Sequence, residues 1–181
     1  MSLLKIYFIG IVLMVASCKS NEISVVNSVN ATAIEVFTED EVEIPYYDFE
    51  EFEKFLHIED DEIYVINFWA TWCQPCVEEL PHFESINTTY KHKGVNVVLV
   101  SFDKPAEVEN KLLPYINKHD IRSEVVILSD ANIKSWKDRV DPHWAGSIPI
   151  TIIYSKEKRR FYERTFSLGE LKNEVEKFLK K

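Results

Sequence analysis

Apolar and β-branched residues fill two long stretches of the chain, 63–69 (IYVINFW) and 95–102 (VNVVLVSF). Runs of this kind are typical of central strands that are covered on both faces of a sheet. A shorter apolar run at 124–128 predicts another strand. Segments 150–154 and 160–164 flank a charged turn, which predicts a hairpin. The chain should therefore contain a central β-sheet.

Helical patterns alternate with these strands. Segment 73–91 has an apolar side of helical spacing, and 106–118 and 133–140 predict further helices. Ser167 and Glu170 form a predicted capping box at the start of a last helix. This alternation predicts an α/β domain, in which helices flank a central mixed sheet.

The start of the domain is predicted near residue 41. Segment 42–46 reads as a short edge strand, because Pro45 has no N–H to give to a ladder. Asp48 then predicts the cap of a short helix, with Glu51 as the partner in a capping box. The predicted domain covers residues 41–181.

The residues before the domain predict a tether. Segment 18–40 is polar and mixed, has no sustained hydrophobic period, and contains neither Pro nor Gly. The simplest interpretation is a polar segment that holds the domain away from a membrane. Residues 34–37 are also compatible with the start of a strand.

The first residues form a different kind of segment. Lys5 precedes an apolar run at 6–16, which has the length of the apolar part of a secretion signal and is too short to span a bilayer. The run ends in small residues directly before Cys18. This resembles a bacterial lipoprotein signal, which implies a signal peptide at 1–17 and an acylated Cys18. Cleavage near Ser17 by the soluble-secretion route, or an ordinary buried or membrane-embedded cysteine, are the alternatives.

Composition limits the function classes. The chain has 181 residues, of which 46% are hydrophobic, so it is long enough for one ordinary core. Its net charge of −9 argues against binding of nucleic acid by electrostatic attraction. Of the three cysteines, only Cys73 and Cys76 remain as a pair if Cys18 is lipidated. A disulfide that spans two intervening residues constrains the unfolded chain little, so it would contribute little to the stability of the fold.

The spacing Trp-Cys-Gln-Pro-Cys points to redox chemistry. A strand that runs directly into C-x-x-C at the start of a helix places the Cys73 sulfur at the helix N-terminus. Free N–H groups and the helix dipole stabilise a thiolate there and lower its pKa. We therefore expect Cys73 to be the nucleophile and Cys76, one turn further in, to be the resolving thiol. Pro75 suits the first turn of the helix.

A metal centre is the competing interpretation of this pair. Structural zinc needs four ligands, and one C-x-x-C pair supplies only two. The five histidines are scattered through the sequence without a ligand spacing: His57, His82, His92, His119 and His143. We therefore predict no metal and no organic cofactor, and a copper-binding carrier stays as an alternative.

Two motifs resemble one known group of proteins. The segment INFWATWCQPCVEELP resembles the active site of the thioredoxin fold, and more narrowly that of the membrane-tethered TlpA/ResA-type thiol-disulfide oxidoreductases. Segment 146–151 (GSIPIT) stands where that group carries a cis-proline loop facing the dithiol. The resemblance covers about 42–181, including an insertion at 104–147. Their pattern W-C-x-P-C-x-x-E-x-P is met by Trp72, Cys73, Pro75, Cys76, Glu79 and Pro81.

The resemblance implies further site residues. Pro149 would be the cis-proline, Ile148 its substrate-contacting neighbour, and Trp72 a further substrate contact; a trans Pro149 at the start of an edge strand is the alternative. Thioredoxin itself has a buried Asp where this chain has Asn67, which cannot take a proton. Glu79 matches the glutamate of the TlpA/ResA type and is the expected proton acceptor, against the alternative of a solvated helix residue. That alternative is preferred for the adjacent Glu78.

The function that this resemblance implies is thiol-disulfide exchange outside the cytoplasm. We expect a lipid-anchored disulfide reductase in the cell envelope, facing the periplasm. Its partners would be exported proteins with thiols or disulfides, and a membrane or periplasmic electron donor. A copper carrier and a non-catalytic thioredoxin-fold binding module are the alternatives. A peroxidase is disfavoured because its P-x-x-x-T/S-x-x-C pattern is missing.

Overall fold

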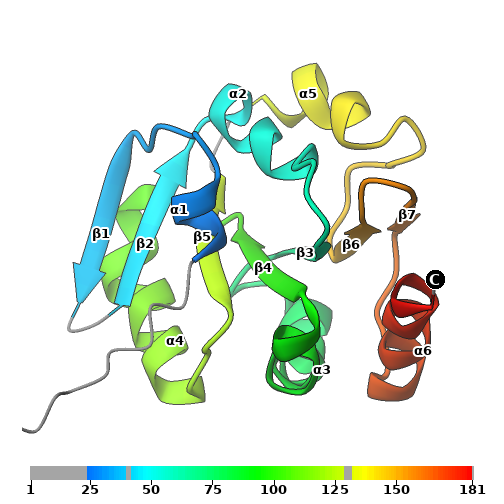
Figure 1. Cartoon of the computed structure of the whole chain (residues 1–181). Helices are drawn as coiled ribbons and strands as arrows, with labels where there is room; N and C mark the ends of the chain where they lie inside the picture. Colours follow the sequence, from blue (N-terminus) through cyan, green and yellow to red (C-terminus); the bar gives the residue numbers. More distant parts are fainter. Residues whose placement is uncertain (1–23, 40–41, 129–131, 181) are drawn as a thin grey trace, which may run out of the picture.

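A seven-stranded mixed sheet forms the centre of the molecule, in the order β1-β2-β5-β4-β3-β6-β7 (Figure 1). The computed structural model describes residues 24–39, 42–128 and 132–180. Neighbours among β2, β5, β4 and β3 are parallel, and the other pairs are antiparallel. The strands are β1 (Glu35–Glu39), β2 (Val42–Tyr47), β3 (Ile63–Trp69), β4 (Val95–Ser101), β5 (Glu124–Leu128), β6 (Ile150–Tyr154) and β7 (Arg159–Tyr162).

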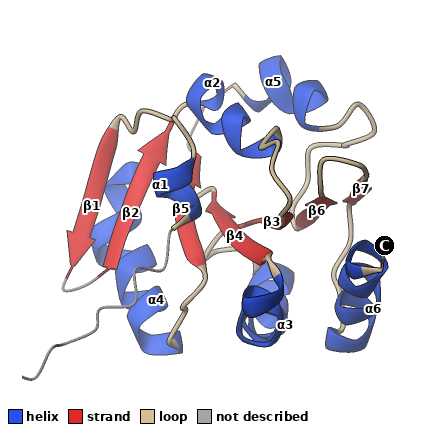
Figure 2. Cartoon of the chain, viewed as in Figure 1, coloured by secondary structure: helices blue, strands red, loops and turns tan. Residues whose placement is uncertain are grey.

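Helices cover both faces of this sheet, as the alternation in the sequence predicts (Figures 1 and 2). One apolar cluster packs α1 (Val25–Ser28), α2 (Phe49–Phe52) and α5 (Ile133–Val140) on one face. The other cluster packs α3 (Gln74–Tyr90), α4 (Leu113–His119) and α6 (Leu168–Leu179) on the opposite face. Within the described ranges, no helix combines the length and the apolar character that a bilayer crossing requires.

The central strands β3 and β4 run side by side and position the site. All seven residues of β3 are buried, which confirms the prediction from their continuous apolar run. The pairing extends from Ile63 opposite Val95 to Trp69 opposite Ser101. Beyond the strands, the Phe102 N–H donates to the Trp69 carbonyl at 2.9 Å. The segments that follow β3 and β4 therefore emerge at the same edge of the sheet.

The prediction that β2 is an edge strand is wrong, because β1 pairs with it along its outer side. β2 pairs with β5 only through Tyr46 and Tyr47. Pro45 precedes that stretch, so its missing N–H removes no bond between these two strands. Pro45 lies inside β2, opposite Val36 of β1, so the proline does not mark the edge of the sheet.

The predicted tether, 18–40, is also wrong over its described part. Residues 24–39 contain α1 and β1, so the fold begins well before residue 41. The Glu124 carboxylate accepts hydrogen bonds from the Ser24 hydroxyl and from the Val25 N–H, the latter at 2.7 Å. Most of these residues are exposed or half-buried, so they carry no strong apolar pattern, although residues 34–37 were compatible with the start of a strand.

Local capping signals predicted two helix starts correctly. Asp48 accepts from the Glu51 N–H at 2.9 Å, and Ser167 and Glu170 form the complete capping box of α6. The helix predicted at 106–118 is less regular. It comprises a 3-10 turn (Pro105–Glu107), a π-helical turn (Val108–Leu112) and α4, in which Pro114 lacks the N–H of a regular helix interior.

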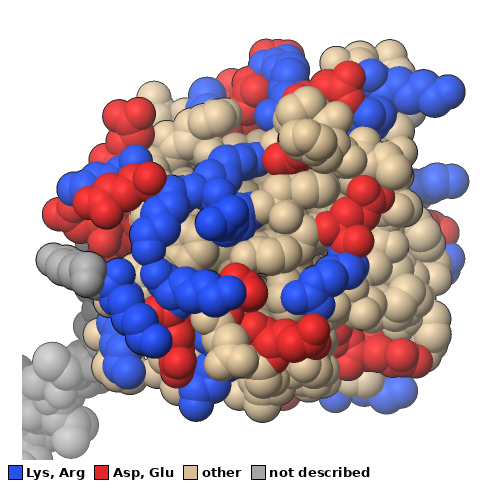
Figure 3. Space-filling model, turned by 90° about the vertical axis from the view of Figure 1, so that its right-hand side faces the viewer, with Lys and Arg blue, Asp and Glu red and all other residues tan. Residues whose placement is uncertain are grey.

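The surface around β7 and α6 carries mixed charge. Figure 3 looks onto this side and shows Lys and Arg side chains lying among Asp and Glu side chains. Two of the ion pairs there join Arg164 to Glu170 at 3.0 Å and Lys177 to Glu174 at 2.7 Å. Exposed pairs of this kind contribute at most about 1 kcal/mol each.

Candidate active site

Cys73 and Cys76 lie where β3 passes into α3, and a disulfide bond joins them. Cys73 is the N-cap residue of α3, which begins at Gln74, and no side chain caps the helix. Cys73 is 6% exposed and Cys76 0% exposed. The sequence-predicted placement is confirmed, with the first sulfur at the helix N-terminus and the second sulfur deeper in the fold.

The loop before β6 faces the dithiol. The Ile148–Pro149 peptide bond is cis, as expected, so the alternative of a trans Pro149 is wrong. The carbonyl oxygen of Ile148 lies 3.9 Å from the Cys73 sulfur. Because Phe68 of β3 pairs with Ile150 of β6, the sheet itself brings this loop beside the cysteines.

Side-chain contacts hold the same loop in place. The buried indole of Trp144 donates its N–H to the Ser147 carbonyl at 2.7 Å. Glu163, after β7, accepts from the Ser147 hydroxyl at 2.7 Å and from the Ala145 N–H at 3.0 Å. The backbone next to Cys73 is thus held by Trp144 from within the loop and by Glu163 from beyond β7.

Trp72 provides an exposed apolar surface next to the reactive sulfur. Its side chain is 64% exposed, although it directly precedes the buried Cys73. Ile148 is half-buried and Pro149 is buried. An exposed aromatic ring beside a held backbone segment is a suitable contact for an extended polypeptide.

Glu79 is buried below the dithiol and is not a solvated helix residue. It is 2% exposed, and its carboxylate accepts hydrogen bonds from the Asn67 amide at 3.2 Å and from the Phe166 N–H at 2.7 Å. Burial raises the pKa of Glu79 to about 7, although both hydrogen bonds oppose the shift. The adjacent Glu78 is exposed and accepts from the Gln74 amide at 2.8 Å, as expected for a surface residue.

Sequence reasoning missed a second buried acid at this edge of the sheet. Asp103 is fully buried and accepts two hydrogen bonds from Thr71, two residues before Cys73. Ser101 adds a third hydrogen bond. The available signal was the Ser-x-Asp pair directly after a buried strand, where parallel strands usually place functional side chains.

A metal centre was the competing interpretation of the cysteine pair, and the described residues bear on it. Within them, no group of three or more His, Cys, Asp or Glu side chains is arranged to hold a metal ion. Cys18, the predicted lipidation site, lies outside the described ranges.

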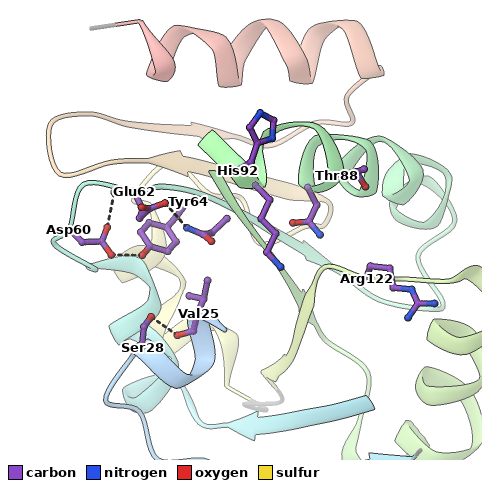
Figure 4. Close-up of a pocket in the computed structure, with 11 residues that line it drawn as sticks. Val25, Ser28, Asp60, Glu62, Tyr64, Thr88, His92 and Arg122 are labelled. Carbon is purple, nitrogen blue, oxygen red and sulfur yellow. Dashed lines mark hydrogen bonds between the residues drawn. The ribbon is translucent and has the colours of Figure 1, made fainter. Parts of the chain in front are cut away.

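Figure 4 shows a cavity of about 940 Å³ elsewhere in the molecule. Its lining includes Glu62 and Tyr64, at the start of β3, whereas the cysteines follow the end of that strand. Seven residues of strand separate the two places by about 20 Å. Inside the cavity the Tyr64 hydroxyl donates to Asp60 at 2.7 Å. The cavity is therefore separate from the redox site.

Known proteins that are similar to this chain include thiol-disulfide oxidoreductases. The family model described as the AhpC/TSA family matches residues 40–159. The chain is 33% identical over 87 residues to the thiol-disulfide oxidoreductase ResA of Oceanobacillus iheyensis, covering 48% of this chain and 41% of that protein. It is 26% identical over 117 residues to ResA of Bacillus anthracis, covering 64% and 61%. The chain thus spans less than two thirds of the length of either relative.

Solved structures share the fold. A secreted thiol-disulfide isomerase from Corynebacterium glutamicum superposes with a TM-score of 0.59 at 14% identity, covering 84% of this chain and 86% of that one. StoA from Bacillus subtilis superposes with a TM-score of 0.52 at 17% identity, covering 80% and 95%. The chain therefore belongs to the AhpC/TSA family, has a thioredoxin-like fold and is similar in sequence to thiol-disulfide oxidoreductases of the ResA type.

Proposed function

We propose that this protein reduces disulfides in exported proteins through Cys73 and Cys76. The observation that carries the proposal is the approach of the Ile148 carbonyl oxygen to within 3.9 Å of the Cys73 sulfur, beside the exposed Trp72. A substrate chain that pairs with the backbone at Ile148 would bring its own disulfide to Cys73. Trp72, Ile148 and Pro149 then form the substrate-binding surface.

The reaction proceeds in two exchanges. The Cys73 thiolate attacks one sulfur of the substrate disulfide, the substrate S–S bond breaks, and the leaving sulfur takes a proton. The Cys76 thiolate then attacks the Cys73 sulfur in the mixed disulfide. The substrate leaves as a dithiol, and the Cys73–Cys76 disulfide holds the oxidising equivalent. An electron donor returns two electrons and two protons to the pair.

Glu79 takes the proton from Cys76 in the second exchange. Cys76 is fully buried, and burial disfavours its thiolate, so a nearby base is needed. Glu79 lies one helical turn further along α3, and its pKa of about 7 suits proton transfer near neutral pH. Asn67 donates to Glu79 but cannot accept a proton.

We further propose that the domain works outside the cytoplasm on a lipid anchor at Cys18. The support is the charged and then apolar start of the chain, which ends in small residues before Cys18. The reducing direction rests on the likeness to the TlpA/ResA type. The electron donor would then be a membrane or periplasmic protein.

A trapping experiment tests the exchange. In Cys76→Ser, the mixed disulfide should accumulate with substrate proteins, because the second exchange is blocked. In Cys73→Ser it should not form, because the attacking sulfur is absent. Non-reducing gels of both variants, followed by reduction, measure this. Faster alkylation of Cys76 than of Cys73 at neutral pH would contradict the assigned roles, and a strongly oxidising reduction potential would contradict the direction.

A further inference from the structure

Asp103 is a fully buried carboxylate beside the connection that leads into the dithiol. It lies two residues beyond the end of β4 and is 0% exposed. In the described part of the chain, no Lys or Arg forms an ion pair with it. A buried charge without such a partner destabilises a fold by several kcal/mol unless hydrogen bonds compensate. Hydrogen bonds to its two oxygens supply the compensation at close range, and the Lys111 ammonium adds a longer-range attraction.

Most of that compensation comes from one residue. The Thr71 N–H donates to Asp103 Oδ2 at 2.9 Å, and the Thr71 hydroxyl donates to Oδ1 at 2.6 Å. The Ser101 hydroxyl also donates to Oδ2, at 2.8 Å, and accepts from the Asp103 N–H at 3.0 Å. Both oxygens of the carboxylate thus hold Thr71, while Ser101 orients the carboxylate from the end of β4.

Thr71 lies in the short connection between β3 and α3. On one side of it, the Trp69 carbonyl accepts from the Phe102 N–H at 2.9 Å. On the other side, the Cys73 N–H donates to the Ala70 carbonyl at 3.1 Å. The bonds from Asp103 fix the middle of this connection, directly before the exposed Trp72 and the reactive Cys73.

We propose that Asp103 is a positioning residue for the dithiol, acting through Thr71. It sets where the Cys73 sulfur and the Trp72 ring lie relative to the Ile148 backbone. The expected effect of Asp103 on substrate reduction rests on the proposed function. The expected effect of Asp103 on the reduction potential of the dithiol does not.

Two consequences follow. Release of Thr71 lowers the effective concentration of one thiol near the other, so the disulfide becomes easier to reduce and the reduction potential rises. Displacement of Trp72 relative to the sulfur slows attack on a protein disulfide more than attack on a small one, which needs no docking.

The test uses the full chain with Thr71→Val, Asp103→Ala and the conservative Thr71→Ser. Redox titration against glutathione gives the equilibrium constant of the dithiol. Rates of reduction of insulin and of 5,5′-dithiobis(2-nitrobenzoate) give a ratio that does not depend on the fraction of folded enzyme. Glu124→Gln is the matched control, because Glu124 also holds backbone N–H groups, but in α1.

We expect Thr71→Val and Asp103→Ala to shift the glutathione equilibrium about threefold or more toward the dithiol, and to lower the rate ratio about tenfold. Thr71→Ser should stay near wild type, and Glu124→Gln should change only the unfolding midpoint. A wild-type potential and rate ratio in Thr71→Val would overturn the proposal, even if Asp103→Ala does not fold. If the wild-type protein does not reduce insulin, the proposed function is contradicted. The reduction potentials of the variants then decide whether Asp103 positions the dithiol.

Discussion

The side chains of Glu79 and Asn67 meet inside the protein, with the Asn67 amide nitrogen 3.2 Å from a Glu79 carboxylate oxygen. The same nitrogen also lies 3.3 Å from the Ile150 carbonyl and 3.2 Å from the Thr151 hydroxyl. Its two protons are therefore shared among three acceptors, and Glu79 gains only part of a hydrogen bond from it. Burial of the carboxylate raises the pKa of Glu79 to about 7, because the Phe166 N–H and this shared Asn67 bond offset only part of the effect of burial.

Glu79→Gln should slow resolution of the mixed disulfide about a hundredfold or more near neutral pH. Glutamine keeps the shape of the side chain but cannot accept the Cys76 proton, and a general base typically contributes about 10²-fold or more. Quenched-flow measurement of resolution across pH checks this. Glu78→Gln is the control, because Glu78 is exposed and contacts Gln74 on the helix surface. Superimposable pH profiles for Glu79→Gln and wild type would mean that water takes the proton.

Glu79 should also make stability depend on pH. Between its ordinary pKa of 4.5 and about 7, the folded protein keeps a proton on Glu79 that the unfolded chain has lost. The free energy of unfolding therefore falls as pH rises through this window, by at most about 3 kcal/mol. Glu79→Gln should flatten that part of the profile. Urea unfolding of both proteins over this pH range measures the difference. Parallel pH profiles of the free energy of unfolding would show that ionisation of Glu79 does not destabilise the fold.

Trp72→Ala should weaken action on protein substrates without destabilising the fold. The side chain is 64% exposed, so its removal should change the free energy of unfolding by less than about 0.5 kcal/mol. Loss of a stacking surface beside Cys73 should raise KM for a protein disulfide about tenfold, the cost of losing one good aromatic contact. Steady-state kinetics and urea unfolding provide the two measurements.

The control for Trp72→Ala is Ile34→Ala. Ile34 is 57% exposed, as an apolar residue that precedes the edge strand β1. It should affect neither KM nor stability. An equal rise in KM in both variants would indicate a general surface effect and not a substrate contact at Trp72.

Cys18→Ser should release the protein from the membrane. Without the cysteine there is no acceptor for the lipid, and the remaining apolar run is too short to anchor the chain stably. Membrane and soluble fractions of cells that produce each form, probed by immunoblot, should show a shift to soluble or unprocessed protein. Continued membrane association of a mature, cleaved Cys18→Ser chain would contradict lipid anchoring.

The sequence by itself determined the central strands, the helix starts and the position of the dithiol. Each depends on local patterns: the continuous apolar residues of 63–69, the capping box at Ser167 and Glu170, and the strand that runs into Cys73. Chain neighbours within a few positions decide these features. These features could therefore be predicted from the sequence alone.

Only the tertiary structure decided which acids are buried and which strand forms the edge. Glu78 and Glu79 are adjacent in sequence, yet only Glu79 meets the Phe166 N–H, 87 positions away. Asp103 reaches Thr71 because two parallel strands end at the same edge of the sheet. β1 covers β2 because residues 35–39 pair antiparallel with β2, which the presence of Pro45 does not prevent. Contacts between residues far apart in sequence bury Glu79 and Asp103. Local patterns could mark them as candidate site residues, but could not establish their burial or their partners.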